Sequence, residues 1–455
     1  MKRSRPEQPV GRRKGAALIA VMWVVILAAL ILLSVNMEMR VHYAMAHNEL
    51  AAVQAHWLAR AGVEQALAIL EDDDIGSDTI LDFWYEDETS FRDVELSGGK
   101  FRVTAPAADE QRPTDPRFGL IDHSARANVN LVDAKQLTSL ADLSESQAAA
   151  ILDWRDGDDK ITPGGAESGY YEYLRYPYKI RNGQFRTSRE LLLVRGIDPT
   201  VYFGEDVNDN GLLDGAEDDG KRSPPDDNAD GKLRPGLAGL TTVYSYEHNR
   251  DAAGNERIDL NTATQQELMT SLGLGEALAK AIVDHRKSNK FARVMDLLKV
   301  KAPRKSPSRG AAPPEAGESS AGEEATNKIT LNWIAEHLDE MTVSDKQRLP
   351  GRINVNTAPR AVLMTLPNMD DATADAIIKQ RDSAAGPFES VGELLTTGAL
   401  KDKQFQAMAE LVTVRSSVFE IRSTGITSRG IRKSIIAVVD RGSSPAGILY
   451  WYQSE

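Results

Sequence analysis

The sequence predicts an α+β fold: a long N-terminal helix, an antiparallel sheet, and a large, mostly α-helical domain inserted between the strands of that sheet. Three observations support this prediction. An apolar run near the N-terminus continues into a longer stretch with helical periodicity. Strand-like runs precede residue 126 and follow residue 410. Between them, one helical unit occurs three times.

The N-terminal helix is expected over residues 16–70. Between Ala16 and Val35 the one polar side chain is Ser34, so the run is long enough to cross a bilayer as a helix. Neither proline nor glycine follows until Gly62, and apolar residues recur at helical spacing to the end of the range. Six basic residues and one acidic residue precede the run, so the positive-inside rule places the N-terminus in the cytoplasm.

Short strands are expected on both sides of the helical domain. Residues 71–125 contain the runs DVEL, KFRVTAP and FGLID, and residues 411–455 contain VFEIRSTGI and IRKSIIAVVDR. The last two runs alternate around Gly430, which predicts an antiparallel hairpin. We therefore assign residues 71–125 and 411–455 to one α/β domain, and residues 126–410 to the insertion.

The three units of the insertion begin RANVN, RIDLN and RINVN, and they are expected over residues 126–197, 257–300 and 352–396. The last asparagine of each opening motif is followed 25 residues later by an arginine: Asn130 by Arg155, Asn261 by Arg286, and Asn356 by Arg381. A phenylalanine and a Leu-Leu pair come next in every copy. Each unit is therefore predicted to be two or three short helices that share one apolar face.

These units resemble helix-hairpin-helix modules, and the second copy does so most closely. In nucleic-acid-binding modules, a Gly-hydrophobic-Gly hairpin presents backbone N–H groups to phosphate. The second copy has Gly273-Leu274-Gly275, followed by Arg286 and Lys287. The other two hairpins carry acidic residues, which repel phosphate. Nucleic-acid binding by the second copy stays an alternative, ranked below a structural role.

The acidic region 205–235 contains a candidate calcium site. Its run DVNDNGLLDGAE matches a twelve-residue EF-hand loop, with oxygen ligands at positions 1, 3, 5, 7, 9 and 12 and a glycine at position 6. The predicted ligands are Asp206, Asn208, Asn210, the Leu212 carbonyl, Asp214 and Glu217. We expect calcium to act in stability, because a metal clip restrains a loop in a chain that has no cysteine.

Two weaker metal candidates accompany this loop. A possible second calcium site consists of Asp226, Asn228 and Asp230, which begin the same pattern. That pattern has Leu237 where a glutamate is needed. The runs DWRDGDD and GGAE form a further oxygen-rich cluster with the residues Asp153, Asp156, Asp158 and Glu167.

Composition excludes several functional classes. The formal net charge of −13 argues against a broad surface for nucleic acid or anionic lipid. The absence of cysteine excludes disulfides and thiolate catalysis. The seven histidines lack paired-ligand spacing, and no Walker loop, GxSxG elbow or dinucleotide fingerprint occurs, so we do not expect an enzyme. Residues 301–326, rich in Pro, Ala, Gly, Ser and Glu, are predicted to be a disordered linker.

Several of these features resemble one known family. Gly15, preceded by basic residues and followed by Ala-Ala-Leu-Ile, resembles a type IV prepilin processing site. Most pilins and pseudopilins carry glutamate at the fifth mature position, where this sequence has Ala20. Together with FGLID, GGAE, INVNTAP and the closing strands from SVFEIRSTG to AVVDR, these residues make the chain similar to the minor pseudopilin K family of type II secretion systems.

The resemblance implies that a prepilin peptidase removes residues 1–15, so that the mature chain begins at Ala16. It also implies a single-pass inner-membrane protein whose bulk is periplasmic and which assembles with the minor pseudopilins I and J. Such a subunit lies at the pseudopilus tip, starts its assembly and supports protein export across the outer membrane. The competing hypothesis is a membrane-anchored helix-hairpin-helix DNA receptor of the competence type.

Overall fold

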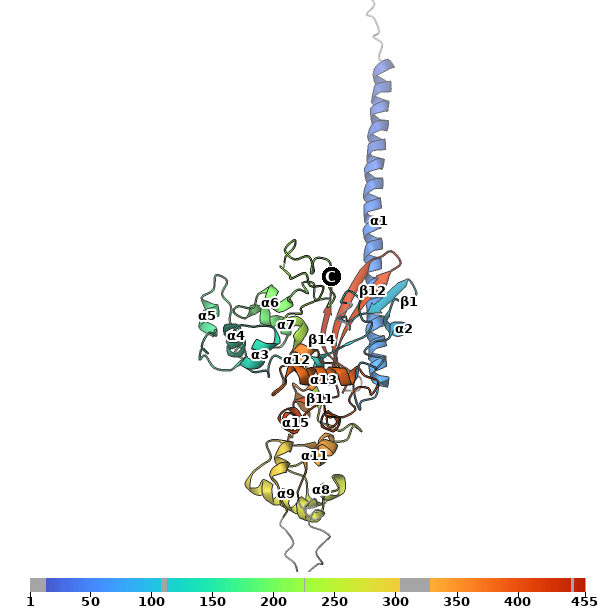
Figure 1. Cartoon of the computed structure of the whole chain (residues 1–455). Coiled ribbons are helices and arrows are strands. Elements are labelled where there is room, and N and C mark those ends of the chain that lie inside the picture. The colour runs from blue at the N-terminus through green and yellow to red at the C-terminus, as the bar shows by residue number, and fades with distance from the viewer. Residues whose placement is uncertain (1–13, 108–112, 225, 303–327, 443–445, 455) are drawn as a thin grey trace, which may run out of the picture.

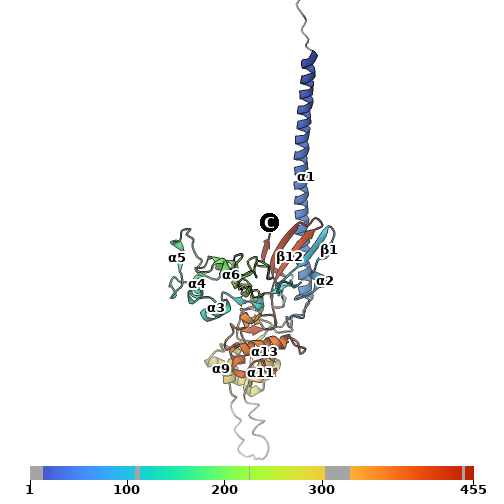
Figure 2. The same cartoon turned by 45° about the horizontal axis from the view of Figure 1, so that its top comes forward.

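The computed structural model describes residues 14–107, 113–224, 226–302, 328–442 and 446–454. One long helix leads into a body that consists of a sheet and a helical insertion, and the N-terminal part of this helix extends away from the body (Figures 1 and 2). Most of the leader predicted at 1–15, and nearly all of the linker predicted at 301–326, lie outside the described residues.

The helix α1 (Lys14–Asp72) confirms the predicted long N-terminal helix. At 1.5 Å per residue it is about 90 Å long. One 18-residue window of this helix has a mean hydropathy of 3.0, and none of its residues is buried in the rest of the structure. The helix is therefore a candidate membrane span. Its second half packs on the sheet through small residues such as Ala55 and Ala59, which are fully buried. A Cβ at Gly425 on the facing strand would lie 2.0 Å from the Ala55 carbonyl oxygen, so a side chain there would force the helix away.

The sheet is antiparallel, with the strand order β1, β2, β12, β13, β14, and β3 also pairs with β12. The strands are β1 (Val94–Leu96), β2 (Gly99–Val103), β3 (Ile121–Asp122), β12 (Val418–Thr427), β13 (Arg432–Asp440) and β14 (Gly447–Gln453), with α2 (Glu88–Phe91) before β1. The predicted hairpin is confirmed as β12 and β13, which turn at Gly430 with φ of +82°. The edge strand β14 was not predicted, because buried and exposed residues do not alternate along it and it therefore lacks the usual strand pattern.

The insertion lies between β3 and β12, which confirms a helical domain placed between strands of the sheet. Its first part contains η1 (His123–Ala125), α3 (Ala134–Leu140), α4 (Glu145–Arg155), α5 (Ser168–Glu172), η2 (Ser188–Leu193), α6 (Pro199–Phe203) and α7 (Leu237–Leu240). The second contains α8 (Gln265–Ser271), α9 (Glu276–Ser288), η3 (Val294–Lys299), α11 (Leu331–His337) and η4 (Leu338–Glu340). The third contains α12 (Arg360–Leu363), α13 (Asp371–Arg381), α14 (Glu393–Thr396) and α15 (Asp402–Met408).

Each unit is closed by two very short parallel strands. β4 (Ala127–Asn128) pairs with β5 (Thr241–Thr242), β7 (Ile258–Asp259) with β8 (Met341–Thr342), and β10 (Ile353–Asn354) with β11 (Val412–Thr413). The second strand of each pair lies beyond the predicted end of its unit, at residue 197, 300 or 396. The sequence could not predict these strands, because two residues are too few to show a period of hydrophobic residues. A further antiparallel pair, β6 (Tyr246–His248) with β9 (Arg348–Pro350), joins the segments that lead into the second and third units.

The repeated asparagine of each unit binds the backbone of the repeated phenylalanine. In the third unit, Asn356 Oδ1 accepts the Phe388 N–H at 2.9 Å, and Asn356 Nδ2 donates to the Phe388 carbonyl at 2.9 Å. The same two bonds join Asn130 to Phe185 and Asn261 to Phe291. We call this arrangement the Asn–Phe clamp. It explains why both residues recur in all three copies.

The arginine at the constant spacing ties the second helix of each unit to the opening strand. Arg381, the last residue of α13, donates to the Ala358 carbonyl at 2.7 Å and to the Val355 carbonyl at 3.3 Å. Arg286 and Arg155 donate to the matching carbonyls of Leu260 and Val129. The separation of 25 residues in the sequence therefore reflects one contact made three times.

Candidate functional site

The predicted calcium loop is folded around its first carboxylate. Asp206 accepts the backbone N–H groups of Asn210 and Gly211, both at 2.9 Å. Asn208 Oδ1 accepts the Asn210 N–H at 3.0 Å, and Asn210 Oδ1 accepts the Leu212 N–H at 2.7 Å. Gly211 has φ of +74°, the left-handed conformation needed at the sixth position of such a loop. These bonds turn the chain sharply between Asp206 and Leu212.

The remaining predicted ligands close the loop from its other end. Glu217 accepts the Val207 N–H with one carboxylate oxygen and the Asp214 N–H with the other, both at 3.0 Å. Asp214 Oδ2 lies 2.7 Å from Asn208 Nδ2 and 2.9 Å from Asn210 Nδ2. Hydrogen bonds therefore link Asp214 to both asparagines and Glu217 to both halves of the loop.

The electrostatics of the loop favour a cation. Asp206 and Glu217 are buried, and burial raises the pKa of Asp206 to about 6 because the charged carboxylate loses solvation. All the donors are carboxylate, amide or carbonyl oxygens, which is the set that calcium prefers. The donor types of residues 206–217 are therefore those of a calcium loop.

The loop is also attached to the sheet. Arg422 on β12 contacts Asp209 within the loop, through the carbonyl and through the carboxylate at 3.5 Å. The same arginine pairs with the buried carboxylate of Glu420, which in turn pairs with Arg126 at 3.2 Å. Order in the loop is thus linked to the boundary between the sheet and the insertion.

The possible second calcium site has a different arrangement. Asp226 is exposed and lies 4.0 Å from Lys221, and Asn228 and Asp230 bond to each other. Its neighbour Asp227 instead accepts backbone N–H groups from residues 219, 220 and 229. Leu237 is fully buried in α7. The three predicted residues therefore do not form the hydrogen-bonded turn that residues 206–217 form.

The oxygen-rich cluster of the first unit brings together three of its four predicted members. Asp153, Asp156 and Glu167 each offer a carboxylate oxygen within 4.8 Å of the others, whereas Asp158 accepts the Lys160 N–H instead. Both oxygens of Glu167 are buried without a hydrogen-bond partner in the described part of the chain. Burial and the Asp153 charge raise the pKa of Glu167 to about 7.

The three hairpins between paired helices differ in what their turns expose. At Gly273, with φ of +63°, and at Gly275, a Cβ would meet no atom within 4 Å. Gly275 is also the N-cap of α9 and has no side-chain cap bond. In the first unit Ser144 caps α4, and in the third Asp370 caps α13. The second hairpin alone among the three leaves its helix N-terminus open, in agreement with the sequence.

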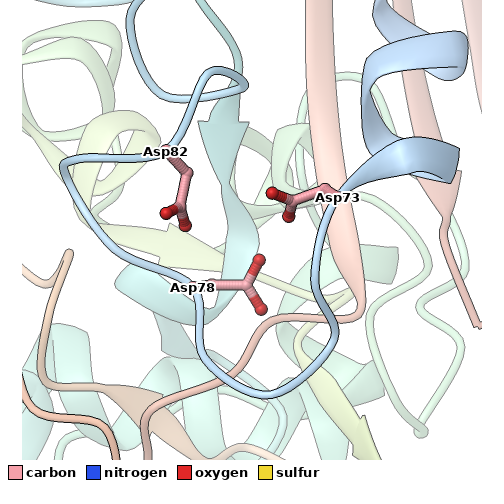
Figure 3. A group of neighbouring side chains, drawn as sticks. All are labelled: Asp73, Asp78 and Asp82. Carbon is pink, nitrogen blue, oxygen red and sulfur yellow. The ribbon is translucent and has the colours of Figure 1, made fainter.

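The sequence does not predict the contacts made within two sets of residues at the centre of the fold. The Asn–Phe clamp joins positions at least 30 residues apart, as in Asn261 and Phe291, although the recurrence of both residues was visible. A third acidic group consists of Asp73, Asp78 and Asp82, in the segment after α1 (Figure 3). No local motif of known spacing marks it.

Three segments match known protein families. Residues 121–203 and residues 353–415 both match families described as type II secretion system (T2SS), protein K. Residues 254–302 match the helix-hairpin-helix motif. The matched segments correspond to parts of the three units of the insertion.

Curated relatives and a solved structure cover parts of the chain. Endonuclease/exonuclease/phosphatase family domain-containing protein 1 from Bos taurus is 30% identical over 178 residues, which are 37% of this chain and 29% of that protein. Type II secretion system protein K from Pectobacterium carotovorum subsp. carotovorum is 26% identical over 203 residues, 42% of this chain and 60% of that one. A chain in the crystal structure of the GspK-GspI-GspJ complex from enterotoxigenic Escherichia coli is 14% identical, with a TM-score of 0.40 and coverage of 90% of this chain and 99% of that one.

Proposed function

We propose that this chain is a minor pseudopilin of the type II secretion protein K kind, and that it is the tip subunit from which pseudopilus assembly starts. The observation that carries the proposal is the pair of protein K matches, one at each end of the helical insertion. The candidate membrane span α1, packed on an antiparallel sheet, supports it. We place the chain in the inner membrane with its N-terminus cytoplasmic and its bulk in the periplasm.

The shape of the molecule supports a position at the end of a filament. The second and third units of the insertion lie on the side of the body opposite to the free end of α1, with α8 and α9 farthest from it, and the first unit lies beside the sheet (Figure 1). A further subunit stacked on that side would meet this bulk. In addition, Ala20 puts no carboxylate in the apolar part of α1, so no neighbouring N-terminal ammonium is needed to offset a buried charge there.

Co-purification tests this function. We expect the chain, expressed with minor pseudopilins I and J and extracted in detergent, to elute with both as one complex. The alternative is a DNA receptor, which the helix-hairpin-helix match over residues 254–302 favours. That alternative predicts retardation of duplex DNA with a steep salt dependence, reduced by Gly273→Asp. A chain that elutes alone and retards DNA at low salt would contradict the tip assignment.

Processing by a prepilin peptidase gives an independent prediction. Gly15→Lys should leave the precursor uncleaved in cells that contain the peptidase, because the proposed cut follows Gly15. Mass spectrometry of the purified chain should find Ala16 at the N-terminus of the wild type and Met1 or its successor in the variant. The matched control is Gly11→Lys, which changes another leader glycine and should leave cleavage intact. A mature N-terminus at any other residue would disprove the assignment.

We also propose that residues 206–217 bind calcium and that the ion stabilises the fold. The hydrogen-bonded turn of the loop, its oxygen donors and the buried carboxylates of Asp206 and Glu217 support this. The Asp153, Asp156 and Glu167 cluster is a second candidate metal position, supported by the two unpartnered oxygens of Glu167. Neither position is proposed to act in catalysis.

A further inference from the structure

Three aspartates meet directly after the membrane helix. Asp73, Asp78 and Asp82 lie in the loop that follows α1, and one carboxylate oxygen of each lies within 4.8 Å of the others. Figure 3 shows the three side chains turned toward a common space. Carboxylates so close together repel each other strongly where water is excluded, unless positive charge is added. We call these residues the Asp trio.

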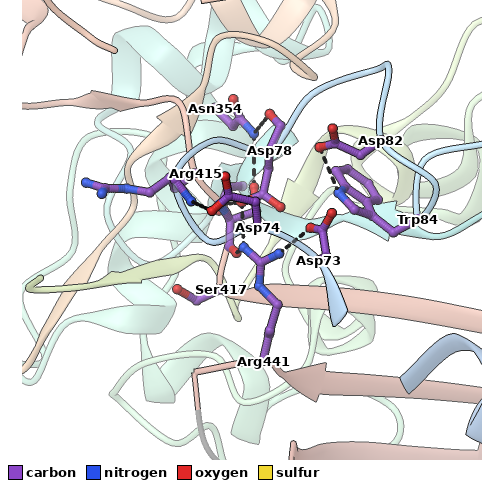
Figure 4. A network of polar contacts seen from close by, with 12 residues as sticks. Asp73, Asp74, Asp78, Asp82, Trp84, Asn354, Arg415, Ser417 and Arg441 are labelled. Atoms are coloured by element: carbon purple, nitrogen blue, oxygen red, sulfur yellow. Dashed lines mark hydrogen bonds and ion pairs between the residues drawn. The ribbon is translucent and has the colours of Figure 1, made fainter. Parts of the chain in front are cut away.

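One basic side chain partly balances the trio. Arg441, just after β13, donates to Asp73 Oδ2 and to Asp78 Oδ2, each at 2.7 Å (Figure 4). Asp78 Oδ2 also accepts the Ser416 N–H at 2.7 Å. Asp82 accepts the Thr79 N–H and the Trp84 indole N–H through its Oδ2. When all three carboxylates are ionised, they and the Arg441 guanidinium leave two negative charges, which is the charge that one divalent cation neutralises.

The central carboxylate has an oxygen that nothing satisfies. Asp78 is fully buried, and its Oδ1 has no hydrogen-bond partner among the described residues. A buried carboxylate oxygen without a partner costs free energy because its hydration is lost. Burial accordingly raises the pKa of Asp78 to about 7 and that of Asp73 to about 6, against the opposing effect of Arg441. The open position is Oδ1, since Arg441 and Ser416 occupy Oδ2.

We propose that the Asp trio is a binding site for a divalent cation of the calcium class, separate from the loop at 206–217. All the donors are oxygens, and hard cations prefer carboxylate oxygens. Arg441 holds the outer oxygens of Asp73 and Asp78, so Asp78 Oδ1 is left to coordinate the ion. Asp82 is oriented by Thr79 and Trp84, which leaves its remaining lone pairs for the same ion.

The position of the trio defines what the ion does. The Asp78 carbonyl accepts the side-chain amides of Asn354 at 3.1 Å and Asn356 at 3.4 Å, both in the third unit. Arg441 ties the trio to the end of β13. The ion therefore joins three parts of the molecule: the end of α1, the sheet and the helical insertion. It locks the insertion at a fixed angle to the membrane helix.

Terbium luminescence tests the proposal on the full chain in detergent. Because the Trp84 indole bonds to Asp82, excitation of Trp84 sensitises a Tb³⁺ ion held by the trio. We use a Glu217→Gln, Glu167→Gln background, which removes a ligand from each other candidate position. In that background we expect sensitised emission that calcium displaces, and a rise in melting temperature when calcium is added.

Three substitutions in that background separate the trio from its surroundings. Asp78→Asn and Asp82→Asn should each abolish both the emission and the calcium-induced rise in melting temperature. Trp84→Phe should remove the emission and keep the rise in melting temperature. The matched control Asp74→Asn removes an exposed carboxylate from the same loop and should change neither readout.

Two results would overturn the proposal. One is a background protein that shows neither emission nor a calcium-dependent melting temperature. The other is an Asp78→Asn variant whose melting temperature exceeds that of the background protein equally with calcium and with chelator. That second result would show that Asp78 carries a proton in the folded chain and that the trio is a structural cluster without an ion.

Discussion

Asn356→Ala should lower the free energy of unfolding by about 3 kcal/mol. Asn356 is fully buried, and it satisfies both backbone groups of the buried residue Phe388. Alanine leaves the Phe388 N–H and carbonyl without partners in a site that water does not reach. Each buried polar group left unpaired costs about 1–3 kcal/mol. Chemical denaturation of the full chain in detergent measures the loss.

The three copies of the clamp provide graded controls for this prediction. Asn130 makes the same two bonds to Phe185 but is only half-buried, so water can replace part of what Asn130→Ala removes. We expect a smaller loss for Asn130→Ala than for Asn356→Ala. Asn332→Ala changes an exposed asparagine on α11 and should have little effect. Equal losses for Asn356 and Asn332 would show that the clamp does not stabilise the fold.

Glu217→Ala should abolish most of the calcium-dependent stability of the chain. Glu217 accepts two backbone N–H groups of the loop. In the proposed site it is also the bidentate ligand at the twelfth position, so its loss removes a charge and two oxygen ligands together. Modules of this kind outside cells bind calcium at about 10⁻⁴ to 10⁻³ M. At 100 times the dissociation constant, mass action stabilises the folded state by about 2.7 kcal/mol. Melting curves with calcium and with chelator measure the difference.

Two controls make the calcium result specific. Asp226→Ala removes an exposed acid from the neighbouring stretch, and the structure predicts no change in the calcium response. A calcium response that fell as much in Asp226→Ala as in Glu217→Ala would instead assign the second stretch to the site. A wild-type melting curve that calcium leaves unchanged, on protein first stripped of metal, would show that residues 206–217 are an acidic loop without an ion.

Local chemistry in the sequence determined much of the fold. The helix α1 follows from an apolar run and helical periodicity without interruption, and the β12–β13 hairpin follows from alternation around Gly430. The tight turn of residues 206–217 could also be predicted from the sequence, because the bonds of Asp206 to Asn210 and Gly211 span at most five positions. Contacts between residues that are only a few positions apart give the sequence a pattern of fixed spacing.

The tertiary structure alone decided the features whose partners are distant in sequence. The two residues of the Asn–Phe clamp are visible as repeats in the sequence, yet their bonds form only where the folded helices between them bring them together. The closing strands are two residues long, and only their pairing reveals them. Asp78 becomes a buried, half-satisfied carboxylate because Ser416 and Arg441, 338 and 363 residues away, fold against it. Burial and pairing of that kind depend on where the whole chain places each group, so no local spacing could encode them.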